Sequence, residues 1–270
     1  KKQVAEELSP NNLFASLLGK SGQEVQARMD SLWNHFFTPG DLSRYEADGE
    51  STVYYEVGDS MGIILDTGNN DVRSEGMSYG MMISVQLDKR DVFDRLWRWA
   101  KRYMAYPDGG DWDGYFCWQC GIDGSQIGTS NASDGEIYFA TALYIAAEKW
   151  REPRYAREAD ELLRKAQSKD GPRTGVYNLY DVETKLVTFV PNEEVHWYSD
   201  PSYCLPAFLE LWAKKADTNN AFWSEAADRA RWLLFASADS VTGLFPDYCL
   251  FDGTPYERPE FFYNTTRYQY

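Results

Sequence analysis

Four polar side chains in this 270-residue sequence each precede a tyrosine by three or four positions, and they are separated by 59, 66 and 64 residues. The four are Glu75, Asp134, Asp200 and Asn264. Two of them carry helix-start signals, because Ser133 and Glu136 have the spacing of a capping box and Asp200 precedes a proline. A single acid in a first helical turn is explained by the helix dipole alone. Four in one register predict that several helices begin around the same cleft.

The side chains at such a cleft suit a neutral sugar. The sequence contains 43 aromatic residues, ten of them tryptophan, and 42 acidic residues against 27 basic ones. Aromatic faces pack on sugar rings, and carboxylates accept hydrogen bonds from hydroxyl groups. Most of the aromatic residues are nevertheless expected to fill the core. Composition therefore favours a carbohydrate-active protein without establishing one.

Helices predominate in the predicted secondary structure. Apolar residues recur at steps of three and four from Glu24 to Phe37, which predicts a helix over 24–37. The same pattern predicts helices over 76–88, 91–104, 135–149, 153–168, 201–214 and 219–236. Glycine-aromatic segments at 114–116, 175–177 and 243–245 separate helix pairs and predict turns or small hairpins.

These features predict an all-α fold, a toroid of helical hairpins whose inner helices begin near 75, 134, 200 and 264 and direct their N-termini into one cleft. We expect one domain over residues 1–270, because no linker or low-complexity segment divides the chain. About seven helices are too few for a closed toroid, and the last one begins six residues before the sequence ends. The chain is then either a fragment, which we favour, or a bundle whose last helix covers an open side.

Composition also limits the classes of partner. The net charge of −15 argues against nucleic acid. No apolar stretch approaches the ~18 residues of a membrane span, so we expect no membrane partner. We also expect a monomeric protein. The chain opens on Lys1-Lys2-Gln3, so any signal peptide is absent from it or already removed.

The four cysteines and two histidines predict no metal site and no cofactor. One CxxC pair, Cys117 and Cys120, is weak evidence for zinc, which usually has a second pair or histidines at fixed spacing. His35 and His196 each lie beside large aromatic residues. We expect all four thiols to be buried as small hydrophobic groups.

At 71–82 the segment DVRSEGMSYGMM resembles the catalytic-acid segment of glycoside hydrolase family 8. YYEVGDSMG (54–62) and LDTGNNDVRSEG (65–76) are similar to its reducing-end-xylose-releasing exo-oligoxylanase branch. Other matching stretches are GYFCW (114–118), SDGEIYFA (133–140), SDPSYCLPAF (199–208), GLFPDYCLFDGTP (243–255) and FFYNTTR (261–267). The resemblance implies an inverting mechanism and an (α/α)6 barrel, of which this chain is roughly the first two-thirds.

Site residues follow from the resemblance position by position. Glu75 falls on the general acid that protonates the leaving oxygen, and Asp134 on the carboxylate that hydrogen-bonds the sugar. Tyr203 matches a residue that helps to hold the attacking water. Trp118 would provide a stacking face, and Tyr198 is also assigned to substrate binding.

The family's general base is an aspartate where this sequence has Asn264. An amide can orient water but cannot take its proton at a useful pH, so the enzyme would be very slow and would still bind substrate. Asn264 is then an engineered substitution, or a natural divergence with the base elsewhere. Arg267 matches an arginine that follows the base position, where an ion pair could steady the site.

Inversion requires an acid and a base about 6.5–9.5 Å apart on opposite faces of the ring. The acid, Glu75, must stay protonated near neutral pH, so its pKa must be raised. A helix N-terminus lowers a carboxyl pKa. Desolvation and repulsion from Asp134 must therefore outweigh the dipole.

The predicted function is an inverting glycoside hydrolase that releases xylose from the reducing end of short β-1,4-xylo-oligosaccharides, with its base disabled by Asn264. One alternative is a non-catalytic oligosaccharide-binding remnant of the same fold. Another is an endo-β-1,4-xylanase or glucanase, which loops on the reducing-end side would distinguish.

Overall fold

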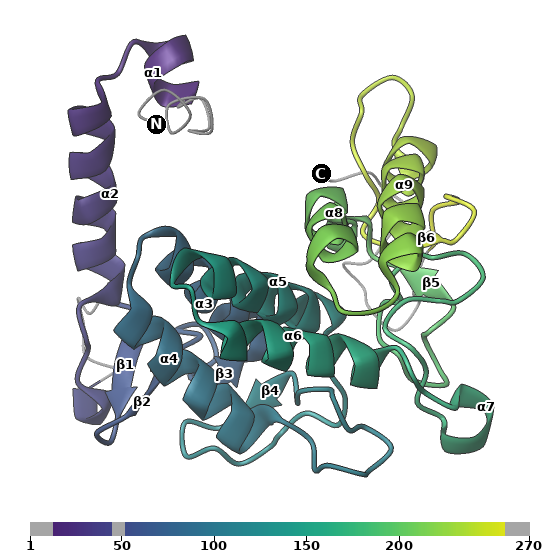
Figure 1. Ribbon diagram of the computed structural model, residues 1–270, viewed down its shortest axis with the longest axis horizontal. Helices are drawn as coiled ribbons and strands as arrows, with labels where there is room; N and C mark the ends of the chain where they lie inside the picture. The colour runs from purple at the N-terminus through teal and green to yellow at the C-terminus, as the bar shows by residue number, and fades with distance from the viewer. Residues whose placement is uncertain (1–12, 45–51, 257–270) are drawn as a thin grey trace. The chain divides into compact units, whose positions relative to one another are not determined.

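The computed structural model describes residues 13–44 and 52–256, and the chain divides into two compact units, Lys1–Glu56 and Val57–Tyr270 (Figure 1). The first unit contains α1 (Leu13–Leu18), α2 (Gly22–Phe37) and the 3₁₀ turn η1 (Leu42–Arg44). Helix α2 confirms the helix predicted over 24–37. It begins earlier because Ser21 and Glu24 form a capping box, with Glu24 N–H donating to Ser21 Oγ at 3.1 Å and Ser21 N–H to Glu24 Oε2 at 2.8 Å.

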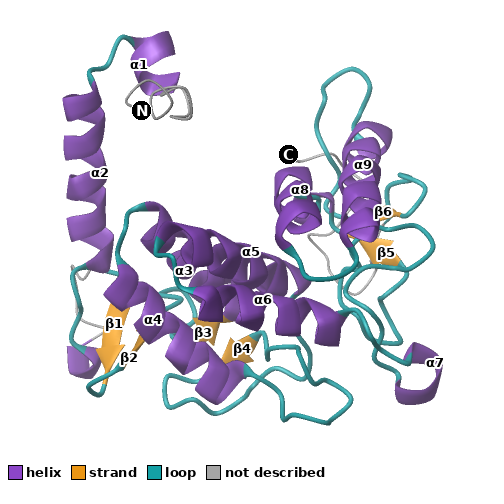
Figure 2. Cartoon of the chain, viewed as in Figure 1, coloured by secondary structure: helices purple, strands orange, loops and turns teal. Residues whose placement is uncertain are grey.

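Helical hairpins make up most of the described part of the second unit, and strands are few and short (Figure 2). The long helices are α3 (Ser74–Gln86), α4 (Arg90–Trp99), α5 (Ser133–Lys149), α6 (Pro153–Ala166), α8 (Pro206–Lys215) and α9 (Asn220–Ser237). Shorter elements are the π-helix η2 (Ala100–Met104), α7 (Gly171–Thr174) and the 3₁₀ turn η3 (Pro201–Tyr203). The strands are β1 (Tyr54–Val57, across the unit boundary), β2 (Met61–Ile64), β3 (Val72–Arg73), β4 (Gln119–Cys120), β5 (Tyr198–Ser199) and β6 (Cys249–Leu250).

The pairs α3–α4, α5–α6 and α8–α9 are the hairpins that the helical periodicity predicted. Helix α5 packs against α3 on one side and α8 on the other, and the indole N–H of Trp212 on α8 donates to Thr141 Oγ1 on α5 at 3.0 Å. Gly80 lets α3 approach its neighbours closely, because a Cβ there would lie 2.6 Å from the Ile64 side chain. The mostly helical fold is thereby confirmed.

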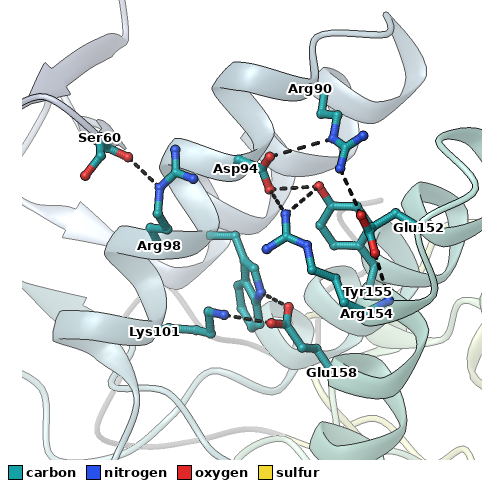
Figure 3. A network of polar contacts seen from close by, with 10 residues as sticks. Ser60, Arg90, Asp94, Arg98, Lys101, Glu152, Arg154, Tyr155 and Glu158 are labelled. Atoms are coloured by element: carbon teal, nitrogen blue, oxygen red, sulfur yellow. Dashed lines mark hydrogen bonds and ion pairs between the residues drawn. The ribbon is translucent and has the colours of Figure 1, made fainter.

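A network of polar contacts joins α4 to α6 (Figure 3). Arg154 Nη2 lies 2.7 Å from Asp94 Oδ1, to which the Tyr155 hydroxyl also donates at 2.8 Å. Glu158 accepts from the Trp97 indole N–H at 2.5 Å and pairs with Lys101 Nζ at 2.8 Å. These contacts hold the outer helices of two hairpins together, so that the inner helices α3 and α5 keep a fixed relation.

One predicted helix is interrupted, and another changes helix type without a change in its extent. The helix predicted over 201–214 is split into η3 and α8, because Leu205 precedes Pro206 and takes a non-helical conformation (φ −113°, ψ 75°). The helix predicted over 91–104 ends as an α-helix at Trp99 and continues as a π-helix to Met104. In neither case does the apolar spacing change, so periodicity alone does not show the break.

No helix within residues 13–44 and 52–256 is both long enough and apolar enough to cross a membrane.

Candidate active site

Helices α3 and α5 begin side by side, and each carries a predicted site carboxyl in its first turn. Glu75 is the second residue of α3, and Asp134 is the second residue of α5. Gly135 allows this approach, because a Cβ there would lie 2.8 Å from Ser74 Oγ and 2.9 Å from Ser74 Cβ. The predicted meeting of the two helix N-termini is confirmed.

The tyrosine that follows Glu75 in the repeat joins the two helices. The Tyr79 hydroxyl on α3 donates to Asp134 Oδ2 on α5 at 2.7 Å. The Tyr138 ring packs against the Tyr79 ring with centroids 4.5 Å apart. The other carboxylate oxygen of Asp134, Oδ1, is buried and has no hydrogen-bond partner among the described residues. Such an unsatisfied acceptor is typical of a group that takes its partner from a ligand.

Burial, and to a lesser extent the neighbouring Asp134 carboxylate, raises the pKa of Glu75 to about 7. Hydrogen bonds from its own backbone N–H and from the Ser74 hydroxyl, together with the Arg73 charge, act in the opposite direction. Desolvation and the second carboxyl therefore outweigh the helix N-terminus, as the acid role requires.

Burial also raises the pKa of Asp134, and the hydrogen bond from Tyr79 opposes this rise. The two carboxyl groups interact, so each disfavours the charged form of the other. The hydrogen bond from Tyr79 favours the charged form of Asp134, so a proton held by the pair prefers Glu75.

The predicted capping box at Ser133 and Glu136 was wrong. Ser133 lies inside α5, the N-cap is Ala132, and no side chain caps the helix. The fully buried Glu136 carboxylate instead accepts from Phe116 N–H at 2.9 Å and from Asn131 Nδ2 at 2.7 Å. Its role is to tie the loop before β4 to the start of α5.

Asp200 was predicted as a helix-start residue without a catalytic role, and the structure brings it to the same region. Its carboxylate caps η3 by accepting from Ser202 N–H at 2.8 Å. Burial raises the pKa of Asp200 to about 7, with smaller contributions from Asp134 and Asp247. Tyr203 belongs to the same group of residues. Burial raises the pKa of its hydroxyl, and the nearby charges of Asp134, Asp200 and Glu75 raise it further. The position of Asp200 before a tyrosine was the sequence signal for this group.

The remaining predicted site residues differ in their surroundings. Trp118 is partly exposed, and its carbonyl oxygen accepts from Ser74 N–H at 3.0 Å, next to Glu75. Tyr198 is fully buried on β5 and stacks on Phe189 at 5.3 Å, so it packs in the interior instead of presenting a face. Asn264 and Arg267 lie outside the described residues.

Neither the cysteines nor the cavity between α4 and α6 adds a residue to the group around Glu75 and Asp134. All four cysteines are free and buried, as predicted. Within the described ranges, no group of three or more His, Cys, Asp or Glu side chains is arranged to hold a metal ion. A cavity of about 370 Å³ lies between α4, α6 and the loop at 105–116 and contains none of the predicted site residues.

Replacement of Glu75 by glutamine is expected to stabilise the protein at pH 8. A folded-state pKa of about 7 against an ordinary 4.5 means that the folded protein binds more protons between these values, so stability falls as pH rises through that window. Removing the carboxyl should recover up to about 3 kcal/mol above pH 7 and nothing at pH 4. Thermal unfolding at both pH values measures this. Glu193→Gln, on an exposed side chain, is the control, and equal melting of Glu75→Gln and wild type at pH 8 would contradict the raised pKa.

Helices α3 and α5 bring together two buried carboxyl groups with raised pKa values at their N-termini, so the protein is of the helical-hairpin class with a paired-carboxyl site. Glycosidases use carboxyl groups with raised pKa values in this way. Comparison with known families agrees, because residues 59–270 match the family described as Glycosyl hydrolases family 8. The chain belongs to this family.

Several relatives share most of this chain. It is 42% identical over 254 residues to a reducing end xylose-releasing exo-oligoxylanase of Halalkalibacterium halodurans, covering 90% of this chain and 61% of that protein. It is 40% identical to Rex8A of Paenibacillus barcinonensis, with 90% and 62% covered. The solved structure of Rex8A complexed with xylose superposes with a TM-score of 0.84 at 38% identity, covering 94% of this chain and 66% of that one. The chain thus spans less than two-thirds of the length of these relatives.

Proposed function

We propose that this chain is part of an inverting glycoside hydrolase that releases xylose from the reducing end of short β-1,4-xylo-oligosaccharides. The observation that carries the proposal is the Glu75–Asp134 pair, two buried carboxyl groups at adjacent helix N-termini, in which burial and Asp134 raise the pKa of Glu75 to about 7 and so suit it to the acid role. The relatives named above as xylose-releasing exo-oligoxylanases supply the substrate class. We also propose that the hairpins close into an (α/α)6 barrel in the whole protein.

In this proposal Glu75 donates its proton to the glycosidic oxygen as the bond to the leaving xylose breaks. Asp134 accepts a hydrogen bond from the sugar through Oδ1, while Tyr79 holds Oδ2. Tyr203 positions the attacking water, and Trp118 stacks against a sugar ring. Arg267 follows the base position, where it would pair with a carboxylate. A water attacks the anomeric carbon from the face opposite Glu75 and inverts it, and its proton passes to a carboxylate base, which the Asn264 amide cannot replace.

A second function is favoured by one specific observation, the amide at Asn264. Without a carboxylate at that position the site still offers stacking and hydrogen bonds but lacks the base. The protein would then bind oligosaccharide without cleaving it at a useful rate. An endo-acting hydrolase is the other alternative, and an endoglucanase of Ruminiclostridium cellulolyticum is 27% identical over 214 residues. With a xylo-oligosaccharide of several units, exo action first gives xylose and a chain one unit shorter, whereas endo action first gives two longer fragments.

Xylotriose is expected to bind with equal affinity in the presence and absence of EDTA, because the proposed contacts are carboxylates and aromatic rings. Asp134→Asn should weaken binding about tenfold, since a charged acceptor is replaced by a neutral one. Isothermal titration calorimetry measures both effects.

The matched control is Asp160→Asn. Asp160, on α6, accepts a hydrogen bond from the Tyr144 hydroxyl on α5 at 2.6 Å, and Tyr144 lies ten residues after Asp134 on that helix. This variant should bind as wild type does. Loss of affinity on chelation would contradict metal-free binding, and failure of the wild type to bind any xylo-oligosaccharide would contradict the proposed function.

A further inference from the structure

Two carboxylates hold the Arg73 side chain immediately before the helix that carries Glu75. Arg73 Nε lies 2.9 Å from Asp66 Oδ2 and 3.1 Å from Asp71 Oδ1. Asp71 is buried and also accepts from the Gln119 side-chain amide at 2.5 Å. The guanidinium therefore has little freedom to rotate.

The guanidinium that is held in this way faces an aromatic ring. Arg73 Cζ lies 5.4 Å from the centroid of the Trp118 ring, within the range of a cation–π contact. Two further contacts fix the same segment. Strand β3 pairs with β4 so that Arg73 lies opposite Gln119, and Ser74 N–H donates to the Trp118 carbonyl oxygen at 3.0 Å.

The backbone at Gly128 also lies close to the Trp118 indole. A Cβ at Gly128 would lie 2.6 Å from Trp118 Nε1, so a glycine is needed for the ring to lie as it does. Trp118 is thus packed at its edge by Gly128, attached through its backbone to Ser74, and contacted by the Arg73 cation. It nevertheless remains partly exposed.

We propose that Arg73 is a positioning residue that fixes the Trp118 ring as a stacking face for a sugar beside Glu75. The inference rests on the proposed function, since it assigns that ring to the same oligosaccharide site. Arginine is required because its planar group binds two carboxylates and faces a ring at once, whereas a lysine ammonium is a compact, mobile charge. Asp66 and Asp71 are the residues that orient it.

Arg73→Lys tests the proposal in two measurements on the full chain. In protein labelled with 5-fluorotryptophan, the fluorine resonance of Trp118, assigned from Trp118→Phe, should shift or broaden in Arg73→Lys. Xylotriose titration should show a dissociation constant raised about three- to tenfold, the usual effect of losing a cation–π contact, because the Trp118 ring would no longer be held in one orientation.

Arg154→Lys is the matched control. Arg154 Cζ lies 4.5 Å from the Tyr155 ring centroid and Arg154 pairs with Asp94, so it is another arginine held by a carboxylate beside an aromatic ring, away from Glu75 (Figure 3). This variant should lower the melting temperature without changing the Trp118 resonance or xylotriose affinity. A thermal melt of each variant distinguishes a loss of protein stability from a change in the orientation of the Trp118 ring.

A double-mutant cycle shows whether Arg73 acts through the ring. In a Trp118→Phe background, Arg73→Lys should have a smaller effect on xylotriose affinity than in the wild type. An unchanged Trp118 resonance in Arg73→Lys, or equal effects in both backgrounds, would overturn the proposal. If the resonance shifts while the wild type binds no xylotriose, the positioning of Trp118 stands and the proposed function fails.

Discussion

Replacement of Asn264 by aspartate is expected to raise the rate of xylotriose hydrolysis by about 10²–10⁴-fold, the usual contribution of a general base. The reason is that a carboxylate can take a proton from the attacking water and an amide cannot. The rate should rise with pH through the ordinary aspartate pKa near 4. It should fall again near pH 7, because Glu75 with its pKa of about 7 must be protonated to act as the acid.

Reducing-sugar release and the anomeric form of the first product measure this prediction. Inversion requires the xylobiose formed, whose anomeric carbon receives the water, to appear first as the α-anomer, opposite to the β bond cleaved. Asn192→Asp is the control, since the Asn192 side-chain oxygen accepts from Glu194 N–H and Val195 N–H and a carboxylate can do the same. Equal rates for the wild type and the Asn264→Asp variant would place the base elsewhere. No hydrolysis by either protein, with xylotriose still bound, would favour the binding function.

The helical hairpins were predictable because each helix carries an apolar repeat of three and four residues. The periodicity located α3, α5, α6 and α9 to within two residues at every boundary. It failed at Pro206, where the rigid ring changes the preceding backbone without altering the apolar spacing. Over 91–104 it gave the correct extent, but it did not predict that the helix becomes a π-helix at Ala100.

The carboxyl pair was predictable for a related reason. The repeat placed Glu75 and Asp134 at helix N-termini, and the family resemblance assigned their roles. What the repeat could not show is how the tyrosines contribute, because the bond from Tyr79 to Asp134 joins residues 55 positions apart. The structure shows that the tyrosine of one helix orients the carboxylate of the next.

The contacts of Glu136 and Arg73 could not be predicted from the sequence, because they depend on residues that the fold brings together. Ser133 and Glu136 fit a capping box, but Glu136 instead accepts from Phe116 N–H, before β4, and from the Asn131 side chain, just before α5. The Arg73 contacts depend on the pairing of β3 with β4, two strands of two residues each. Strands that short carry no periodic signal.

Replacement of Glu75 by glutamine in the Asn264→Asp protein is expected to remove nearly all of the restored hydrolysis, a loss of about 10²–10⁴-fold. Glutamine keeps the size of the side chain and can still accept from the Ser74 hydroxyl, but it carries no proton that it can release to the leaving oxygen. Xylotriose affinity should change little, because the proposed sugar contacts belong to Asp134 and Trp118. A substrate with an acidic leaving group, such as an activated aryl xylobioside, needs less protonation and should lose less activity than xylotriose. Equal losses on both substrates would contradict the general-acid role, since a residue that only shapes the site would slow every substrate alike.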